Sequence, residues 1–254
     1  MAFTSIISFL IFFCVTQFKI QLNAFTIMMA VIMDIIAILS EIVCFTAYGK
    51  GPISQFTVFQ MQGGMLLPFL YGVSQGDNLT PPKILGILIM TVALILTVSN
   101  DNHQRQKLSK IFIFLCVMIF FINGSVSIGS YIYSNNSMTM GPANFIMIKS
   151  AILGVTAIIV WSAARLRYRE KIASKELVFR NGLLICACAM DNISYFLQLV
   201  SAAHLSSTVL YPVVTGGTVV LTAIAGHIFF HEKHSKKAII GFILSFVATV
   251  LFAF

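Results

Sequence analysis

Residues 33–41, MDIIAILSE, place two carboxylates, Asp34 and Glu41, inside an apolar segment that covers residues 24–47. An apolar segment of about 20 residues is long enough to cross the hydrocarbon core of a bilayer as a helix. A carboxylate at the centre of such a helix costs about 2.5–3.5 kcal/mol on an insertion scale, so it is expected to face protein or a water-filled cavity. The stretch therefore predicts a membrane-spanning helix with one polar face.

The rest of the chain has the same apolar character. Of its 254 residues, 58% are hydrophobic and only 9% are charged, whereas a soluble globular domain carries about 25% charged residues. Comparable apolar segments lie at 3–18, 24–47, 52–73, 82–98, 110–133, 141–163, 180–200, 205–229 and 236–253. We therefore expect an all-α polytopic protein with about nine transmembrane helices, integral to the cell membrane.

The basic residues lie mainly in short loops between these segments. The net charge is +8, and thirteen of the 16 Lys and Arg residues fall in alternate loops, against only Lys19 and Lys83 in the loops of the opposite side. Such an asymmetry is typical of the positive-inside rule, which predicts that the thirteen cations face the cytosol. Nine spans then place the N-terminus inside and the C-terminus outside. The charge indicates a topology, and we expect no nucleic-acid partner.

The two halves of the sequence share a pattern. Residues 190–198, MDNISYFLQ, repeat the Met-Asp pair of residues 33–41 and again carry a polar residue seven positions after the aspartate. The next segment in each half contains a glycine pair, and an acidic-x-x-Ser/Thr-x5-Gly motif follows it. The matched residues are Asp34, Glu41, Gln55, Gln62, Gly63, Gly64, Asp77, Thr80 and Gly86 in the first half, and Asp191, Gln198, Thr208, Thr215, Gly216, Gly217, Glu232, Ser235 and Gly241 in the second. Several matches in one order predict an internal duplication.

The motif that closes each half has a structural interpretation. Thr80 and Ser235 precede apolar segments, and a hydroxyl at the N-cap of a helix can accept a hydrogen bond from a free N–H group of the first turn. Gly86 and Gly241 follow six residues later, and a glycine on a membrane helix lets a neighbouring helix approach closely. We expect helix caps at the hydroxyl positions and close helix packing at the glycines.

These features together resemble a known family. The segments YGKGPISQFTVFQMQGGMLLPFLYG at 48–72 and YPVVTGGTVVLTAIAGHIFFHEKHSKKAIIGF at 211–242 are similar to the closing helix pair of the EamA-type repeat of the drug/metabolite transporter superfamily. The resemblance covers about residues 24–254. It implies ten helices in two inverted repeats: here a first repeat at 1–100 with four spans, which lacks the first helix of the pattern, and a second at 101–254 with five.

Polar side chains form a stripe on each of four segments, two in each half. Residues seven apart project from the same face of a helix, as Asp34 and Glu41 do. The residues of the four stripes are Asp34, Glu41, Gln55, Gln62, Asp191, Tyr195, Gln198, Tyr211 and Thr215. We expect them to line one central cavity near the middle of the bilayer. The resemblance implies a substrate path along the same four helices.

Other interpretations of these side chains remain open. Polar groups also hold neighbouring membrane helices together, so the stripes fit a structural role as well. Lys149 lies inside an apolar segment, where it fits a counter-ion to an acid, an anchor for an anionic substrate, or a side chain that snorkels to the interface. The stretch HIFFHEKH at 227–234 has histidines at metal-ligand spacing, but it lies at the end of a span and we expect no metal there.

The combined features favour a secondary active transporter, an exporter of small metabolites or amphipathic compounds that works by alternating access. Asp34 and Glu41 are its candidates for proton coupling. The alternatives are a non-transporting membrane subunit or a channel, and an intramembrane lipid-modifying enzyme. The sequence has no P-loop and no hydrolase or metalloprotease motif, so we expect neither a cofactor nor an enzymatic activity. The expected partners are the lipid bilayer, a small-molecule substrate and protons, with a homodimer as an open alternative.

Overall fold

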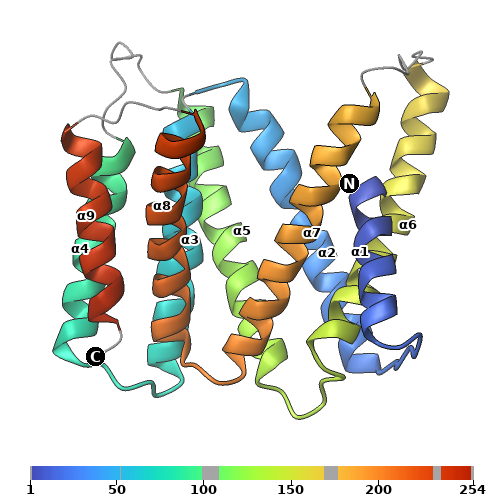
Figure 1. The fold of residues 1–254 in the computed structure, drawn as a ribbon, viewed down its shortest axis with the longest axis horizontal. Coiled ribbons are helices and arrows are strands. Elements are labelled where there is room, and N and C mark those ends of the chain that lie inside the picture. The colour runs from blue at the N-terminus through green and yellow to red at the C-terminus, as the bar shows by residue number, and fades with distance from the viewer. Residues whose placement is uncertain (1, 52, 99–108, 169–176, 231–235, 253–254) are drawn as a thin grey trace. The chain divides into compact units, whose positions relative to one another are not determined.

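The structure, a computed structural model, describes residues 2–51, 53–98, 109–168, 177–230 and 236–252. These residues form nine α-helices and no strand (Figure 1). The helices are α1 (Ala2–Val15), α2 (Ala24–Tyr48), α3 (Ile53–Ser74), α4 (Pro81–Val98), α5 (Lys110–Ser134), α6 (Pro142–Tyr168), α7 (Leu177–Ala202), α8 (Ser207–Phe230) and α9 (Lys236–Leu251). Each apolar segment of the sequence contains one of them, so the predicted all-α fold is confirmed for the described part of the chain.

Five of the helices are long and apolar enough to cross a membrane within the residues that the structure describes. The candidate spans are Ala24–Tyr48, Lys110–Ser134, Pro142–Ile159, Ile185–Ala202 and Ser207–Ala225. Two shorter apolar helices cover Thr4–Val15 and Pro81–Thr97. Because a helix needs about 20 predominantly apolar residues to span the hydrocarbon core, these five helices indicate an integral membrane protein.

Local chemistry accounts for several helix ends. Asn23 precedes α2, and its side-chain oxygen accepts a hydrogen bond of 3.2 Å from the N–H of Phe25, as an N-cap does. Proline occupies the first position of α4 and of α6, where its missing N–H leaves no hydrogen bond unmade. After α3, Gly76 has φ 94°, and the N–H of Asp77 donates to the carbonyl of Gly72 at 3.0 Å. This is a glycine C-cap.

The chain forms two compact units. Unit 1 comprises Met1–Ile35 and Ser130–His204, and unit 2 comprises Ile36–Gly129 and Leu205–Phe254. Both α2 and α5 contribute residues to each unit. Each unit thus contains residues from both halves of the sequence, so the units do not coincide with the two repeats predicted at 1–100 and 101–254.

In unit 1, α1 packs against α6 and α7. The hydroxyl of Thr16 donates to the sulfur of Met147 at 3.8 Å. Farther back along α1, Ser5 lies 3.5 Å from the place that a Cβ on Gly154 would occupy. The early part of α1 therefore meets the later part of α6, which means that these two helices are antiparallel.

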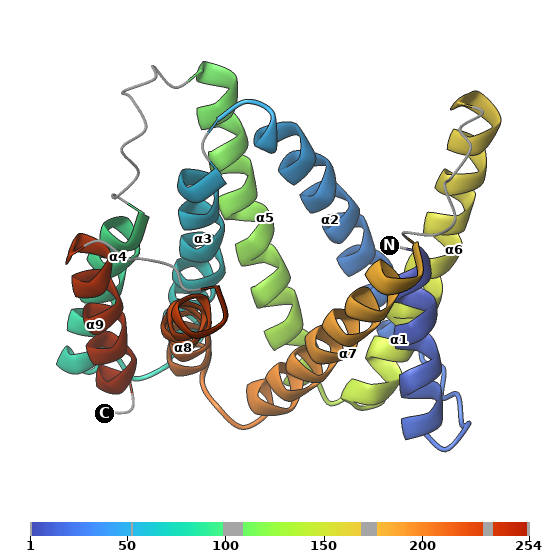
Figure 2. The ribbon, with the colours of Figure 1, turned by 45° about the horizontal axis from the view of Figure 1, so that its top comes forward.

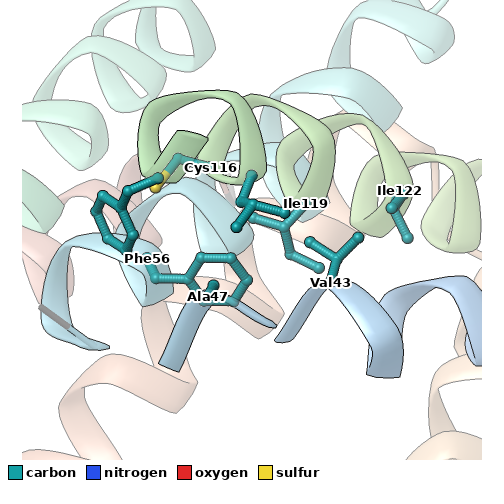
Figure 3. Packing of buried hydrophobic residues seen from close by; sticks show 8 residues of the cluster. Val43, Ala47, Phe56, Cys116, Ile119 and Ile122 are labelled. Atoms are coloured by element: carbon teal, nitrogen blue, oxygen red, sulfur yellow. The ribbon is translucent and has the colours of Figure 1, made fainter. Parts of the chain in front are cut away.

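In unit 2, α3 packs against α8, and the second half of α2 packs with α3 and α5 around one apolar cluster. Figure 3 shows this cluster, whose buried members are Val43, Ala47, Phe56, Phe112, Leu115, Cys116, Ile119 and Ile122. At Gly63 the two backbones are in direct contact, because a Cβ on this residue would collide with the carbonyl group of Phe120. Gly63 therefore sets how closely α3 and α5 approach each other.

The other close pair of unit 2 is α4 and α9, which lie side by side in Figures 1 and 2. A Cβ on Gly86 of α4 would lie 3.1 Å from the ring of Phe252, just beyond the end of α9. A Cβ on Gly241 of α9 would lie 2.9 Å from the carbonyl oxygen of Ala93 and from the N–H of Thr97 in α4. Each glycine thus lies at a close contact with the partner helix, and the order of these contacts shows that the pair is antiparallel.

Candidate functional site

Asp34 is the most unusual polar residue of unit 1. It lies on α2, its side chain is only 2% exposed, and neither of its carboxylate oxygens has a hydrogen-bond partner. A buried polar group without a partner loses its hydration and receives nothing in exchange, and the penalty is largest for a charged group. The carboxyl group of Asp34 therefore has unused capacity for a proton or for another donor.

Lys149 on α6 is the cation that interacts electrostatically with this carboxyl group. The two residues do not form an ion pair, and both oxygens of Asp34 lack a hydrogen-bond partner. Instead, the ammonium group of Lys149 lies over the ring of Tyr195, at 4.5 Å from its centroid. This distance is typical of a cation–π contact.

The hydroxyl group of Tyr195, on α7, makes a separate contact from the one that its ring makes with Lys149. Its hydroxyl group shares a hydrogen bond of 3.1 Å with the hydroxyl of Ser130, a buried residue near the end of α5. Tyr195 belongs to the predicted stripe of α7, whereas Ser130 does not belong to any predicted stripe. The only signal for Ser130 was its place at the end of a run of small residues, INGSVSIGS at 122–130, and such a run indicates close packing without naming a partner.

The other predicted residues of α7 differ from Tyr195 in their surroundings. Asp191 is exposed and Gln198 is half-buried in the chain. The next residue, Asn192, is buried instead, and its amide donates to the hydroxyl of Ser8 on α1 at 2.6 Å. Sequence spacing could not identify Asn192, because this residue faces α1 and not the predicted stripe.

The predicted residues of unit 2 fall into two groups. Glu41 and Gln55 are exposed. Gln62 is buried, with its amide nitrogen 3.4 Å from the carbonyl oxygen of Thr91 and its side-chain oxygen without a partner. Tyr211 is buried and donates to the carbonyl of Ser127.

Thr215, the last member of the predicted stripe of α8, is half-buried. The predicted central cavity would require residues of both compact units, those of unit 1 around Asp34 and those of unit 2 around Gln62. A cavity shared in this way stays a prediction.

Thr80, the hydroxyl residue of the motif in the first half, does not form the expected side-chain cap. Thr80 directly precedes α4, yet its hydroxyl is buried without a partner. The expected hydroxyl cap is therefore wrong for this residue. The reason is that Pro81 and Pro82 have no N–H, while the N–H of Lys83 donates to the backbone carbonyl of Thr80 at 3.0 Å. Glu232 and Ser235, the corresponding residues of the second half, lie outside the described residues.

Asp77 stabilises the start of a helix from the other half of the chain. Its Oδ2 accepts hydrogen bonds from the N–H of Thr208 at 3.3 Å and from the hydroxyl of the same residue at 3.1 Å. Nearby, the hydroxyl of Ser207 donates to the carbonyl of Pro68 on α3 at 2.9 Å. A carboxylate at the N-terminus of a helix satisfies a free N–H and interacts favourably with the helix dipole. Asp77 thus connects the loop after α3 to the beginning of α8.

Replacing Asp77 by alanine is expected to lower the free energy of unfolding by about 1 kcal/mol, the usual cost of losing a capping side chain. The measurement is the midpoint of thermal unfolding in detergent, followed by circular dichroism. Asp77→Asn is the matched control, because its side-chain oxygen can still accept both hydrogen bonds from Thr208, and it should retain most of the wild-type midpoint. An unchanged midpoint for Asp77→Ala would show that these bonds do not stabilise α8.

The described residues contain no group of three or more His, Cys, Asp or Glu side chains placed to hold a metal ion. His231 and His234 of the HIFFHEKH stretch lie outside them. Comparison of the sequence with models of known protein families and with curated proteins found no match. The similarity to the EamA-type repeat therefore stays a prediction from the sequence.

Proposed function

We propose that the chain is a secondary active transporter that exports small metabolites or amphipathic compounds and couples their movement to protons. The carboxyl group of Asp34 carries this proposal, because it is buried and unpartnered inside a helix that is long and apolar enough to span a membrane. Ionisable residues within membrane helices are costly, and they commonly mark proton relays or substrate pathways. A carboxyl group that has no protein donor is available to a proton or to a substrate.

The packing of corresponding helices supports the proposed inverted repeats. α1 and α6 are antiparallel in unit 1, and α4 and α9 are antiparallel in unit 2. The first repeat is predicted to lack the first helix of the pattern. The helices α1 to α4 of the first repeat therefore correspond to α6 to α9 of the second, so α1 and α6 are counterparts, and so are α4 and α9. An inverted repeat requires that counterpart helices run in opposite directions, and such repeats are common in secondary transporters.

In the proposed mechanism, the two repeats rock against each other and expose a central site first to one side of the membrane and then to the other. Protonation of Asp34 and binding of the substrate exclude each other, so a proton that enters on one side releases the substrate there. Glu41 lies on the same helix but is exposed in the chain, which makes it the weaker candidate for the coupling carboxylate. Nine spans and a cavity lined by the predicted stripes are part of this proposal.

The proposal is tested by measuring metabolites inside and outside cells in which the gene is deleted, restored, or strongly expressed. We expect at least one compound to accumulate inside the deletion strain and to be depleted inside the expressing strain, with opposite changes in the medium. Expression of the Asp34→Asn variant at the same level should not deplete that compound. If no compound shows opposite changes in the two strains, the chain is not an exporter of a cellular metabolite.

A further inference from the structure

We propose that Tyr195 is a positioning residue that holds the ammonium group of Lys149 away from Asp34 and so keeps the carboxyl group of Asp34 free. The consequence for coupling rests on the proposed function, but the arrangement itself does not. All of the residues concerned belong to unit 1.

Lys149 has two possible partners. It lies close enough to Asp34 to interact with it electrostatically, yet the two do not form an ion pair. Its ammonium group lies at 4.5 Å from the centroid of the Tyr195 ring. A cation over the face of an aromatic ring is attracted by the ring quadrupole, and the attraction is stronger when water is excluded. The ring therefore competes with the carboxylate for the same ammonium group.

The ring of Tyr195 is held in this position by a hydrogen bond at its hydroxyl group. Tyr195 shares a hydrogen bond of 3.1 Å with Ser130, whose side chain is only 1% exposed. α7 and α5 therefore hold the tyrosine at its hydroxyl end, while its ring face receives Lys149 from α6. The cation–π contact needs the aromatic ring, whereas the hydroxyl only anchors it.

Because Lys149 contacts Tyr195, the carboxyl group of Asp34 stays unpaired. Asp34 is 2% exposed and both of its oxygens lack a partner, so pairing with Lys149 would satisfy it. A buried ion pair would also lock the site, because opposite charges attract strongly where water is excluded. By holding Lys149, Tyr195 prevents that pairing and leaves Asp34 to exchangeable partners, of which a proton is the smallest.

The test uses dicyclohexylcarbodiimide, a hydrophobic reagent that adds to protonated carboxyl groups in apolar surroundings. The rate of its addition to Asp34 is measured by mass spectrometry of the peptide that contains this residue, on purified protein in detergent. An ion-paired carboxylate lacks the proton that the reagent requires. Tyr195→Leu should therefore slow the labelling of Asp34 roughly tenfold, a factor that lies between those expected for losing an exposed and a desolvated cation–π contact.

Three further variants separate positioning from a structural effect. Tyr195→Phe keeps the ring face and should label at close to the wild-type rate. Lys149→Met should label at least as fast as wild type, and the double variant Tyr195→Leu/Lys149→Met should recover that rate, because no ammonium group is left to pair with Asp34. Recovery in the double variant also shows that the leucine did not unfold the protein.

The proposal is overturned if Tyr195→Leu labels at the wild-type rate, if Tyr195→Phe is as slow as Tyr195→Leu, or if the double variant stays slow. These outcomes are independent of the transport assays. If labelling follows the expected pattern and no transported compound is found, the positioning role stands and the proposed function fails. If Asp34→Asn abolishes transport and the labelling pattern is absent, this inference alone fails.

Discussion

Replacing Gly63 by valine is expected to lower the free energy of unfolding by about 3 kcal/mol or more, the upper end of what overpacking usually costs. The reason is the contact between α3 and α5, in which a Cβ on Gly63 would collide with the backbone carbonyl of Phe120. A side chain could change its rotamer to make room, but a helix backbone cannot. The two helices would have to separate along the apolar cluster that Phe56 and Cys116 help to form.

Two measurements check this expectation, thermal unfolding in detergent and the reaction of Cys116 with a maleimide. Cys116 is only 2% exposed, so opening of the α3–α5 contact should raise its rate of labelling. Gly217→Val is the matched control: it makes the same substitution inside α8, where nothing lies within 4 Å of the added Cβ. Its midpoint and its Cys116 labelling should stay close to wild type. Equal losses in both variants would show that the close approach at Gly63 is not the cause.

Replacing Asp34 by asparagine is expected to abolish transport driven by a pH gradient and to leave exchange of substrate for substrate intact. Asparagine has nearly the same shape as aspartic acid but cannot take up or release a proton, so the variant separates proton coupling from packing. The measurement uses protein reconstituted in liposomes and the compound identified by metabolite profiling. Net movement is recorded with a pH gradient, and exchange is recorded without one.

Glu41→Gln is the matched control for this prediction. It removes a carboxylate from the same helix, but from a side chain that is exposed in the chain rather than buried. We expect it to retain pH-driven transport. Equal pH-driven rates in wild type and in Asp34→Asn would remove Asp34 from proton coupling, and a selective loss in Glu41→Gln would assign that role to Glu41.

Much of the fold was predictable because membrane helices have strong sequence signals. Each apolar segment contains a helix in the described part of the chain, and the ends differ by only a few residues. Glycine was informative for a similar reason. The close approach expected at Gly86 and Gly241 depends on the absence of a side chain, which can be read directly from a sequence.

The partners of the polar side chains were less predictable. Thr80 was expected to cap α4 through its hydroxyl, but two prolines after it removed the N–H groups that such a cap serves. Asp77 was identified only as the acidic position of the repeated motif, and its spacing gave no sign that it binds Thr208 far along the chain. Ser130 and Asn192 escaped notice because a serine or an asparagine in an apolar segment does not reveal which helix it faces.

The sequence by itself determined that the chain is helical and apolar, where its helices lie, and that two of them carry an aspartate at corresponding positions, Asp34 and Asp191. The length of an apolar segment and the position of a glycine within it are properties of a short stretch of sequence, so they can be read without knowing which helices pack together. Only the tertiary structure decided that Asp34 is buried without a partner while Glu41 is exposed, and that Lys149 contacts Tyr195 instead of an acid. Those choices depend on which helices meet and how they are rotated, and a single helix does not encode that information.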